Sequence, residues 1–177
     1  MRSKRYKESY IKSIFFDWIL PIAAAIVIAA LINRFLLFKV YIPSESMQPT
    51  INKDDQLFVT RIYNRKNIGR GDILVFESKE LDDLLIKRVI GLPGDSIDIV
   101  EGTVIVNGEA LEESYVVYSQ ITNGHYEVPD GKYFFLGDNR ANSRDSRYWD
   151  DPYIDGEDIQ GKAQVRVYPF NNIGFIK

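Results

Sequence analysis

The pattern of hydrophobic and polar positions divides the chain near residue 40. Before that point, an uncharged apolar stretch runs from Trp18 to Asn33, and further apolar residues flank it on both sides. Its 16 residues would span about 24 Å as a helix, slightly less than a hydrocarbon core of about 30 Å, and the flanks supply the difference. The pattern therefore predicts one transmembrane helix over residues 14–38, with Asp17 and Arg34 at the two interfaces.

Two alternatives compete with a retained membrane anchor. A buried core helix is usually amphipathic, whereas neither face of this stretch is polar. A cleaved signal peptide is the stronger rival, because small residues of the kind found at cleavage sites occupy positions 23–25 and 29–30. The apolar stretch continues past both groups to about Phe38, which favours a retained anchor.

Beyond residue 40 the helical period disappears, and short runs of β-branched and aromatic residues alternate with Gly, Pro, Asn and Asp. This punctuation is typical of strands and turns. Glu101-Gly102 and Asn107-Gly108 are hairpin-turn signals that flank one of the runs. The sequence predicts a mainly β fold, an antiparallel and barrel-like β-sheet domain preceded by one helix. Strands are expected at residues 56–60, 72–76, 86–90, 96–100, 103–106, 115–121, 133–136 and 163–168.

The composition removes several kinds of chemistry. The 177 residues include no cysteine and one histidine, His125, which excludes thiol nucleophiles and nearly excludes a multi-histidine metal centre. The net charge of −3 conceals a charge of +5 over residues 1–41 and −8 over residues 42–177. An acidic body repels phosphate backbones, so nucleic acid is not an expected partner. Most of the basic residues of the first segment precede the helix, which predicts a cytoplasmic N-terminus and an exported body.

A serine hydrolase without a histidine base needs another base, and a desolvated lysine can serve because burial lowers the pKa of an ammonium group. Alternation along a strand places Lys87 on one face with Leu85 and Val89. Arg88 then lies on the other face, where it can reach water. Alternation alone favours an ordinary strand lysine whose ammonium group also reaches solvent.

Two polar segments could carry the rest of such a site. Residues 43–50 hold Ser44 and Ser46 between prolines, so one hydroxyl could act as nucleophile and the other as an oxyanion donor. A Ser/Pro linker between anchor and domain explains the same residues. Residues 137–147 mix turn formers with alternating charges, which fits either a solvated loop or a loop that lines a site. His125 lies in a turn context, with no carboxylate arrangement evident around it, and is expected at the surface.

In this order, the segments resemble the bacterial type I signal peptidases, membrane-bound serine proteases that use a Ser-Lys dyad. The resemblance covers nearly the whole chain. It is carried by the anchor and by four ordered blocks, which run from Pro43 to Thr50, Gly71 to Phe76, Ile86 to Asp95 and Gly137 to Arg147.

The resemblance implies a role for each matching residue. Ser46 matches the nucleophile and Lys87 the general base, whereas Ser44 matches the oxyanion-hole hydroxyl and Ser143 a serine that orients the lysine. The loop that supports the site would contribute Asp138, Asn139 and Arg140, together with an ion pair between Asp145 and Arg147. Shallow apolar pockets for substrate would draw on Ile42, Pro43, Met47, Ile51, Leu85 and Ile86. No metal and no organic cofactor is implied.

The resemblance also implies a function and a place in the cell. The protein would be an endopeptidase of the bacterial plasma membrane that removes signal peptides from exported precursors by cutting after small residues at −1 and −3. Its partners would be signal-peptide-bearing precursors, the lipid bilayer and the secretion translocon. Residues 1–13 would form a cytoplasmic segment, residues 14–38 a single-pass anchor and residues 39–177 the extracytoplasmic peptidase domain.

Two departures from the family pattern and two other functions stay open. Ala141 stands where the family often has Asp, and Leu85 where it often has an aromatic residue. A catalytically silent or dedicated relative in surface-protein or pilus assembly would keep the fold. Silent relatives lose the nucleophile or the base, however, and here Ser46 and Lys87 are both present. A self-cleaving Ser-Lys repressor would need a DNA-binding region and a cytoplasmic address, and the anchor argues against both.

Overall fold

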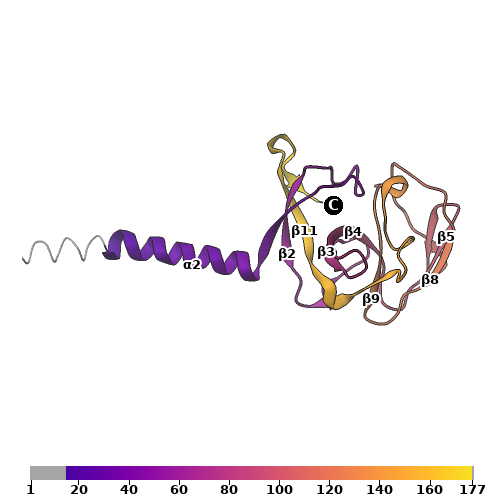
Figure 1. Cartoon of the computed structure of the whole chain (residues 1–177), viewed down its shortest axis with the longest axis horizontal. Helices are drawn as coiled ribbons and strands as arrows, with labels where there is room; N and C mark the ends of the chain where they lie inside the picture. The colour runs from indigo at the N-terminus through magenta and orange to yellow at the C-terminus, as the bar shows by residue number, and fades with distance from the viewer. Residues whose placement is uncertain (1–14, 177) are drawn as a thin grey trace, which may run out of the picture. The chain divides into compact units, whose positions relative to one another are not determined.

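The computed structural model describes residues 15–176. Residue contacts divide the chain into two compact units, of which the first ends at Phe38 and the second begins at Lys39. The first unit contains one continuous helix. It begins with a π-helical segment, η1 (Phe15–Ile19), and continues as α2 (Leu20–Phe35) (Figure 1).

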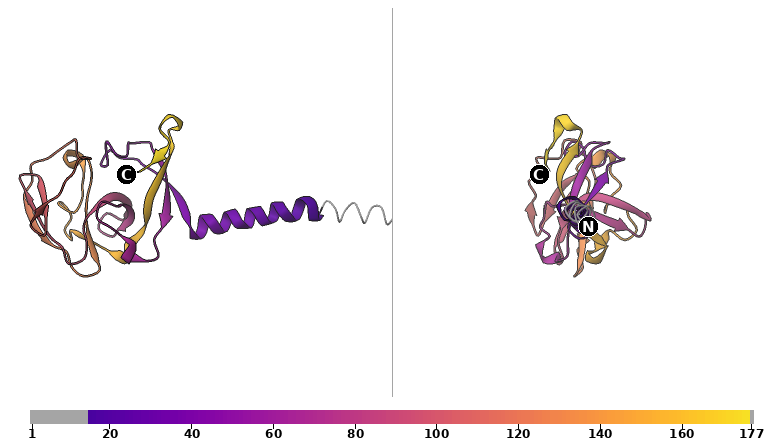
Figure 2. Two further views of the ribbon diagram at one scale, coloured as in Figure 1. Left: turned by 180° about the vertical axis from the view of Figure 1, so that it is seen from behind. Right: turned by 90° about the vertical axis from the view of Figure 1, so that its left-hand side faces the viewer.

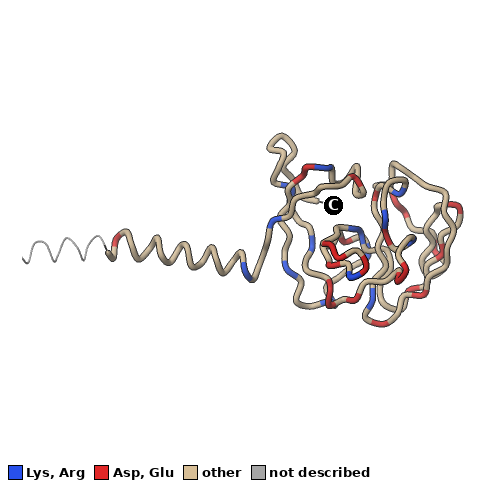
Figure 3. The backbone as a smooth tube through the Cα atoms, viewed as in Figure 1, with Lys and Arg blue, Asp and Glu red and all other residues tan. Residues whose placement is uncertain are grey.

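The helix is apolar along its length. In the described part of the chain, Phe15–Phe35 is the one helical stretch long and apolar enough to cross a membrane, with 21 residues, of which 18 in succession have a mean hydropathy of 2.4. Figure 3 shows charge only near its two ends, where Asp17 and Arg34 lie. The helix ends before the predicted limit at residue 38, because β1 (Leu37–Tyr41) follows and joins the sheet. The basic segment expected at residues 1–13 lies outside the described residues.

The second unit is built on an eight-stranded sheet. Its strands follow the order β1-β2-β11-β3-β4-β9-β10, and β12 pairs with β11 (Figure 1). The pairs that join β2, β3, β4, β9, β10, β11 and β12 are antiparallel. The bounds are β2 Gln56–Arg61, β3 Ile73–Ser78, β4 Asp83–Gly91, β9 Lys132–Leu136, β10 Tyr153–Asp155, β11 Ile159–Tyr168 and β12 Gly174–Phe175.

A four-stranded sheet in the order β7-β6-β5-β8 lies at the outer end of the same unit (Figures 1 and 2). Both predicted hairpin turns are confirmed, since they join β5 to β6 and β6 to β7. Glu101 and Gly102 have φ angles of 50° and 85°, and Asn107 and Gly108 have 53° and 85°, the left-handed values that a tight type I′ hairpin requires. The bounds are β5 Ser96–Val100, β6 Thr103–Val106, β7 Glu109–Ala110 and β8 Gly124–Glu127.

Two apolar cores meet at β4 and β9. Successive residues of a strand point to opposite faces, and here both faces are covered. Phe135 packs in one core with Phe76, their ring centroids 4.3 Å apart, and Phe134 packs in the other core with Ile97. Double burial explains why β9 reads as a continuous apolar run in the sequence and not as an alternating one. These two strands are therefore rigid, and they fix the position at which the polar loop after β9 begins.

The predicted mainly β fold is confirmed, with one predicted strand wrong. Seven of the predicted strands fall within or overlap β2, β3, β4, β5, β6, β9 and β11. Residues 115–121 form no strand, although they are rich in aromatic and β-branched residues. Their polar groups pair instead with the loop after β9. The Ala141 N–H donates to the Tyr118 carbonyl at 3.1 Å, and the Tyr148 hydroxyl donates to the Gln120 side chain at 2.9 Å.

Candidate active site

Ser46 lies in a tight turn between β1 and β2 and is only 6% exposed. The turn is closed by hydrogen bonds from the Gln48 N–H to the Glu45 carbonyl at 3.1 Å and from the Ile51 N–H to the Met47 carbonyl at 2.9 Å. The linker reading of this segment is therefore wrong, because a linker would be solvated and free of such bonds.

Lys87 lies in the middle of β4, opposite Leu74 of β3, and is 4% exposed. Its Nζ donates to the Ser46 Oγ at 2.8 Å and to the Ile86 carbonyl at 3.1 Å. The preference for a solvent-exposed lysine, drawn from alternation alone, is wrong, because the Ser46 turn packs over this face of the strand. A serine hydroxyl and a lysine amine that are 41 positions apart in sequence thus share one buried contact.

Burial sets the protonation of Lys87. Desolvation lowers the pKa of this amine from 10.5 to about 8, while the nearby carboxylates of Asp145 and Asp138 act in the opposite direction. At pH 7 a group with this pKa is neutral in roughly a tenth of the molecules, compared with fewer than about one in a thousand for an exposed lysine. The site therefore provides an amine that can accept a proton near neutral pH.

Two buried ion pairs neutralise those carboxylates. Arg88 binds Asp138 through two contacts of 2.8 and 2.6 Å, and Arg147 binds Asp145 through contacts of 2.8 and 2.9 Å. The expectation that Arg88 reaches water is wrong: it is 4% exposed, because Asp138 lies across its face of the strand. The structure brings together all four of these residues around the dyad.

The loop after β9 also holds the backbone of the Ser46 turn. The Asn139 N–H donates to the Ser46 carbonyl at 3.0 Å, and the Asn139 side-chain amide donates to the Glu45 carbonyl at 3.2 Å. The Thr50 hydroxyl donates to Asp138 at 2.5 Å. The position of the proposed nucleophile is thus set by hydrogen bonds from a segment about 90 residues further along the chain.

Gly137 lies where the turn and the loop touch. A Cβ atom at this position would be 2.2 Å from the Ser143 Oγ and 2.5 Å from the Ser46 carbonyl oxygen, distances that no real Cβ adopts. Its N–H donates to Asp145 at 2.9 Å, and its carbonyl accepts from Arg140 at 3.0 Å. The absence of a side chain is therefore what allows Ser143 to lie next to the backbone of Ser46.

The two further predicted serines differ in their surroundings. Ser44 is exposed, and its Oγ is 3.4 Å from the Ser46 Oγ, at the outer limit of a hydrogen bond. Ser143 is 7% exposed, and its Oγ has no hydrogen-bond partner within residues 15–176. The role of Ser143 in orienting Lys87 stays a prediction, since the Lys87 amine donates to Ser46 and Ile86 instead.

Sequence reasoning missed Glu113 and Tyr115. Arg140 is 4% exposed and binds the Glu113 carboxylate through both of its terminal nitrogens, at 2.9 and 2.5 Å. The Arg88 guanidinium carbon lies 3.9 Å from the centre of the Tyr115 ring. No sequence signal links these pairs, which are 27 positions apart, so only the path of the irregular segment after β7 reveals them.

A pocket of about 180 Å³ opens beside the dyad, on the side of Lys87 and Ser44. Four predicted substrate-binding residues line it, namely Ile42, Pro43, Leu85 and Ile86, together with Val40, Tyr41, Val75, Asp83 and Leu84. Met47 and Ile51 do not line it, and both are fully buried. A substrate-binding role for these two residues stays a prediction.

His125 lies away from these residues, in β8 of the small sheet. It is at the surface as predicted, with its side chain 59% exposed. The expectation that no carboxylate flanks it is wrong. Asp98 faces it across the β5–β8 pair, 2.7 Å from Nδ1, and Glu127 is 3.0 Å from Nε2, which together raise the His125 pKa.

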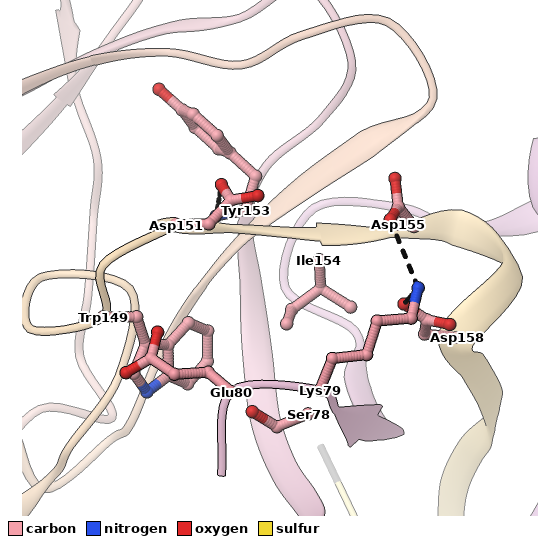
Figure 4. A pocket seen from close by; sticks show the side chains of 9 residues that line it. All are labelled: Ser78, Lys79, Glu80, Trp149, Asp151, Tyr153, Ile154, Asp155 and Asp158. Atoms are coloured by element: carbon pink, nitrogen blue, oxygen red, sulfur yellow. Dashed lines mark hydrogen bonds and ion pairs between the residues drawn. The ribbon is translucent and has the colours of Figure 1, made fainter. Parts of the chain in front are cut away.

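An acid-rich pocket of about 80 Å³ lies between the β3–β4 turn and β10 (Figure 4). It contains none of the predicted site residues, and Lys79 forms ion pairs there with Asp155 and Asp158 at 3.5 and 2.6 Å. Within the described residues, no group of three or more His, Asp or Glu side chains is arranged to hold a metal ion.

Comparison with known proteins decides the family of this site. Residues 15–168 match the family described as "Signal peptidase, peptidase S26". The chain belongs to this family of signal peptidases. It is 40% identical to the signal peptidase I of Leptolyngbya laminosa over 89% of this chain and 82% of that protein. It is 36% identical to the probable signal peptidase I-2 of a Synechocystis strain over 98% of this chain and 83% of that protein.

A Bacillus relative agrees with this assignment. The signal peptidase I of Bacillus licheniformis is 35% identical over 94% of this chain and 96% of that protein. A crystal structure of a signal peptidase I from Enterococcus faecalis aligns with a TM-score of 0.49 and 31% identity, over 54% of this chain and 96% of that chain. The predicted recognition as a type I signal peptidase, a serine endopeptidase that removes signal peptides, is confirmed by the family and the relatives.

Replacement of Lys87 by methionine tests whether this signal peptidase buries an amine. The pKa of Lys87 is about 8 in the folded chain, compared with 10.5 when unfolded. Burial of the charged amine therefore lowers the free energy of unfolding fully below about pH 8, and this loss fades as the pH rises to 10.5. Lys87→Met should therefore raise the free energy of unfolding by about 3 kcal/mol at pH 7 and by about 1 kcal/mol at pH 10. Denaturant titration of the detergent-solubilised chain measures both values.

The exposed Lys53 provides the control, because Lys53→Met should change stability by no more than about 0.5 kcal/mol at either pH. An equal gain for Lys87→Met at pH 7 and pH 10 would attribute the effect to packing and not to the buried charge.

Proposed function

We propose that this signal peptidase cuts its substrates with Ser46 as nucleophile and Lys87 as general base. The observation that carries the proposal is the 2.8 Å contact between the Lys87 amine and the Ser46 hydroxyl in a buried position. A neutral amine at this distance can take the hydroxyl proton as the oxygen attacks the scissile carbonyl. The lowered Lys87 pKa supports this role, because it makes the neutral form accessible near physiological pH.

The remaining steps need donors and a proton path. The developing oxyanion would accept hydrogen bonds from the Ser46 N–H and from the Ser44 hydroxyl, which is weakly held at 3.4 Å and free to turn towards it. The protonated Lys87 would then give its proton to the leaving amine. Next it would deprotonate the water that hydrolyses the acyl-enzyme. The Ser143 hydroxyl, which has no hydrogen-bond partner among residues 15–176, would orient the amine during these transfers.

The loop residues would act as supports and not as reacting groups. Asn139 holds the Ser46 carbonyl, whereas the Arg88–Asp138 and Arg147–Asp145 pairs fix the loop beneath the dyad. Arg140 bonds the Gly137 carbonyl and so keeps the glycine against Ser46 and Ser143.

The apolar pocket beside Lys87 suits the small residues at −1 and −3 of a signal peptide. Ile42, Leu85 and Ile86 give this pocket aliphatic walls, which would favour apolar side chains over charged ones. An extended precursor would lie along the strand edges beside it, so main-chain bonds would supply binding and the pocket selection.

The proposed location is the bacterial plasma membrane, which the chain would cross once with its N-terminus in the cytoplasm. The apolar helix Phe15–Phe35 and the five basic residues that precede it in sequence, at positions 2, 4, 5, 7 and 12, support this orientation. Residues 39–177 would then be the extracytoplasmic peptidase domain. The partners would be the bilayer, signal-peptide-bearing precursors and the secretion translocon that delivers them.

Removal of either member of the dyad should abolish cleavage. We expect Ser46→Ala and Lys87→Ala to reduce kcat/KM on a secretory precursor by roughly 10⁴-fold or more, since these residues act as one unit. Cleavage by detergent-solubilised full-length protein measures the effect, with Ser96→Ala and Lys132→Ala as controls at partly exposed positions. Full activity in folded Lys87→Ala would exclude the lysine base, and an inert wild type would favour a silent assembly factor.

The pH dependence of cleavage should follow the Lys87 amine. Below about pH 8 the amine is charged and cannot accept a proton, so kcat/KM should fall about tenfold for each unit towards acid and level off above that pH. Initial rates between pH 5 and 9.5, with folding checked at each pH, give the profile. A rate independent of pH over this range would contradict a lysine base.

The Leu85 side chain should set the size limit of the pocket. Leu85→Ala should raise kcat/KM for precursors with Val or Leu at −1 or −3, relative to Ala, by about tenfold, because the removed atoms no longer exclude the larger residue. Leu111→Ala makes the same change against the other core and serves as the control. An unchanged ratio in Leu85→Ala would remove Leu85 from the specificity pocket.

A further inference from the structure

A second hollow opens beside Ser143. It has a volume of about 460 Å³ and is lined by Gln120, Ala141, Asn142, Ser143, Arg144 and Tyr148. No residue lines both this hollow and the apolar pocket beside Leu85. Its walls differ in chemistry as well, because they carry amide, hydroxyl and guanidinium groups and no carboxylate.

The two hollows lie against different members of the reacting centre. Lys87 and Ser44 line the apolar pocket, whereas Ser143 lines the polar hollow. Ser143 is itself next to the nucleophile, since a Cβ on Gly137 would touch both its Oγ and the Ser46 carbonyl oxygen. Ser143 is 7% exposed, and its buried hydroxyl has no hydrogen-bond partner in the part of the chain that the structure describes. Ser46 therefore adjoins one lining residue of each hollow, Lys87 of the apolar pocket and Ser143 of the polar hollow.

The polar hollow carries one adaptable positive charge. Arg144 is 63% exposed, and the ion pair that it forms is a long contact of 3.3 Å with Glu80. Exposed pairs of this kind contribute only about 0.2–1 kcal/mol, so the guanidinium can exchange Glu80 for another acid. The neighbouring Arg147 cannot do so, because its side chain is 3% exposed and doubly bonded to Asp145.

Neutral donors surround this charge. The Gln120 side-chain oxygen accepts from the Tyr148 hydroxyl at 2.9 Å and from Arg147 at 3.4 Å, which leaves its N–H groups as donors. The Asn142 side-chain N–H donates to Glu45 at 3.5 Å, a contact too long to be strong. The lining thus offers a mobile cation and several donors to a ligand that accepts hydrogen bonds.

We propose that this hollow binds the first residues of the mature chain, those that follow the scissile bond, and that Arg144 makes it favour acidic over basic side chains there. The inference rests on the proposed function, because it assigns the second side of the same substrate. The enzyme would then select substrates by residues on both sides of the scissile bond. Residues before the bond would be selected by size and apolarity, and residues after it by charge.

Charge reversal at Arg144 tests the inference. Precursor peptides identical up to Ala at −1, with Glu, Gln or Lys at +1 and +2, are cut by the detergent-solubilised full-length protein at low ionic strength. Wild type should prefer Glu over Lys in kcat/KM by about three- to tenfold, with Gln between them, as expected for an exposed charge pair. Arg144→Glu should invert this order, and Arg144→Gln should remove it.

Lys132→Glu is the matched control, because it changes the charge equally and disrupts another surface ion pair, that with Asp151. It should keep the wild-type order. The inference is overturned if the order is the same in wild type and Arg144→Glu, if wild type does not discriminate, or if Lys132→Glu inverts the order as well. A folded wild type that cuts none of the peptides would instead overturn the proposed function, so the two failures are distinguishable.

Discussion

The arrangement of the candidate site centres on one buried contact, that between the Lys87 amine and the Ser46 hydroxyl. The amine can accept a proton near neutral pH only if desolvation lowers its pKa by more than the nearby carboxylates raise it. Asp138 and Asp145 both favour the charged form of the amine. Arg88 and Arg147 bind these two carboxylates, and the balance leaves the Lys87 pKa at about 8. The ion pairs therefore serve two purposes, since they support the loop and limit the field that would otherwise keep the lysine protonated.

The fold brings these groups together through two adjacent strands and the loop that follows one of them. Alternation along β4 sends Lys87 to the Ser46 turn and Arg88 to the opposite face, where Asp138 neutralises it. The strand β9 pairs with β4 and leads directly into Gly137. Because both strands are packed on both faces, the loop begins from a rigid position, and a glycine at its start allows the closest approach to Ser46.

The two hollows beside Lys87 and Ser143 differ in chemistry and, under the proposed function, would apply two kinds of selection. The pocket next to Lys87 is walled mainly by aliphatic side chains, so under the proposed function it would select for apolar residues. The hollow next to Ser143 is wider and polar, so discrimination there would depend on charge and hydrogen bonding. The Arg88, Arg140 and Arg147 side chains are all bound to carboxylates in buried pairs, whereas Arg144 lies at the surface. Among these four arginines, Arg144 has the most exposed side chain and a long ion pair of 3.3 Å with Glu80, so it is the one best placed to exchange its partner for a ligand.

The sequence by itself determined the local features of this protein. Continuous apolarity gave the helix, β-branched runs between turn formers gave most strands, and the ordered serine, lysine and loop blocks indicated the family. Tertiary structure alone decided that Lys87 and Arg88 are buried and that residues 115–121 form no strand. It also decided that Glu113 forms an ion pair with Arg140. The physical reason is that burial and pairing depend on which distant segment covers a residue. Periodicity reports which face of a strand a side chain occupies, and it carries no information about what packs against that face.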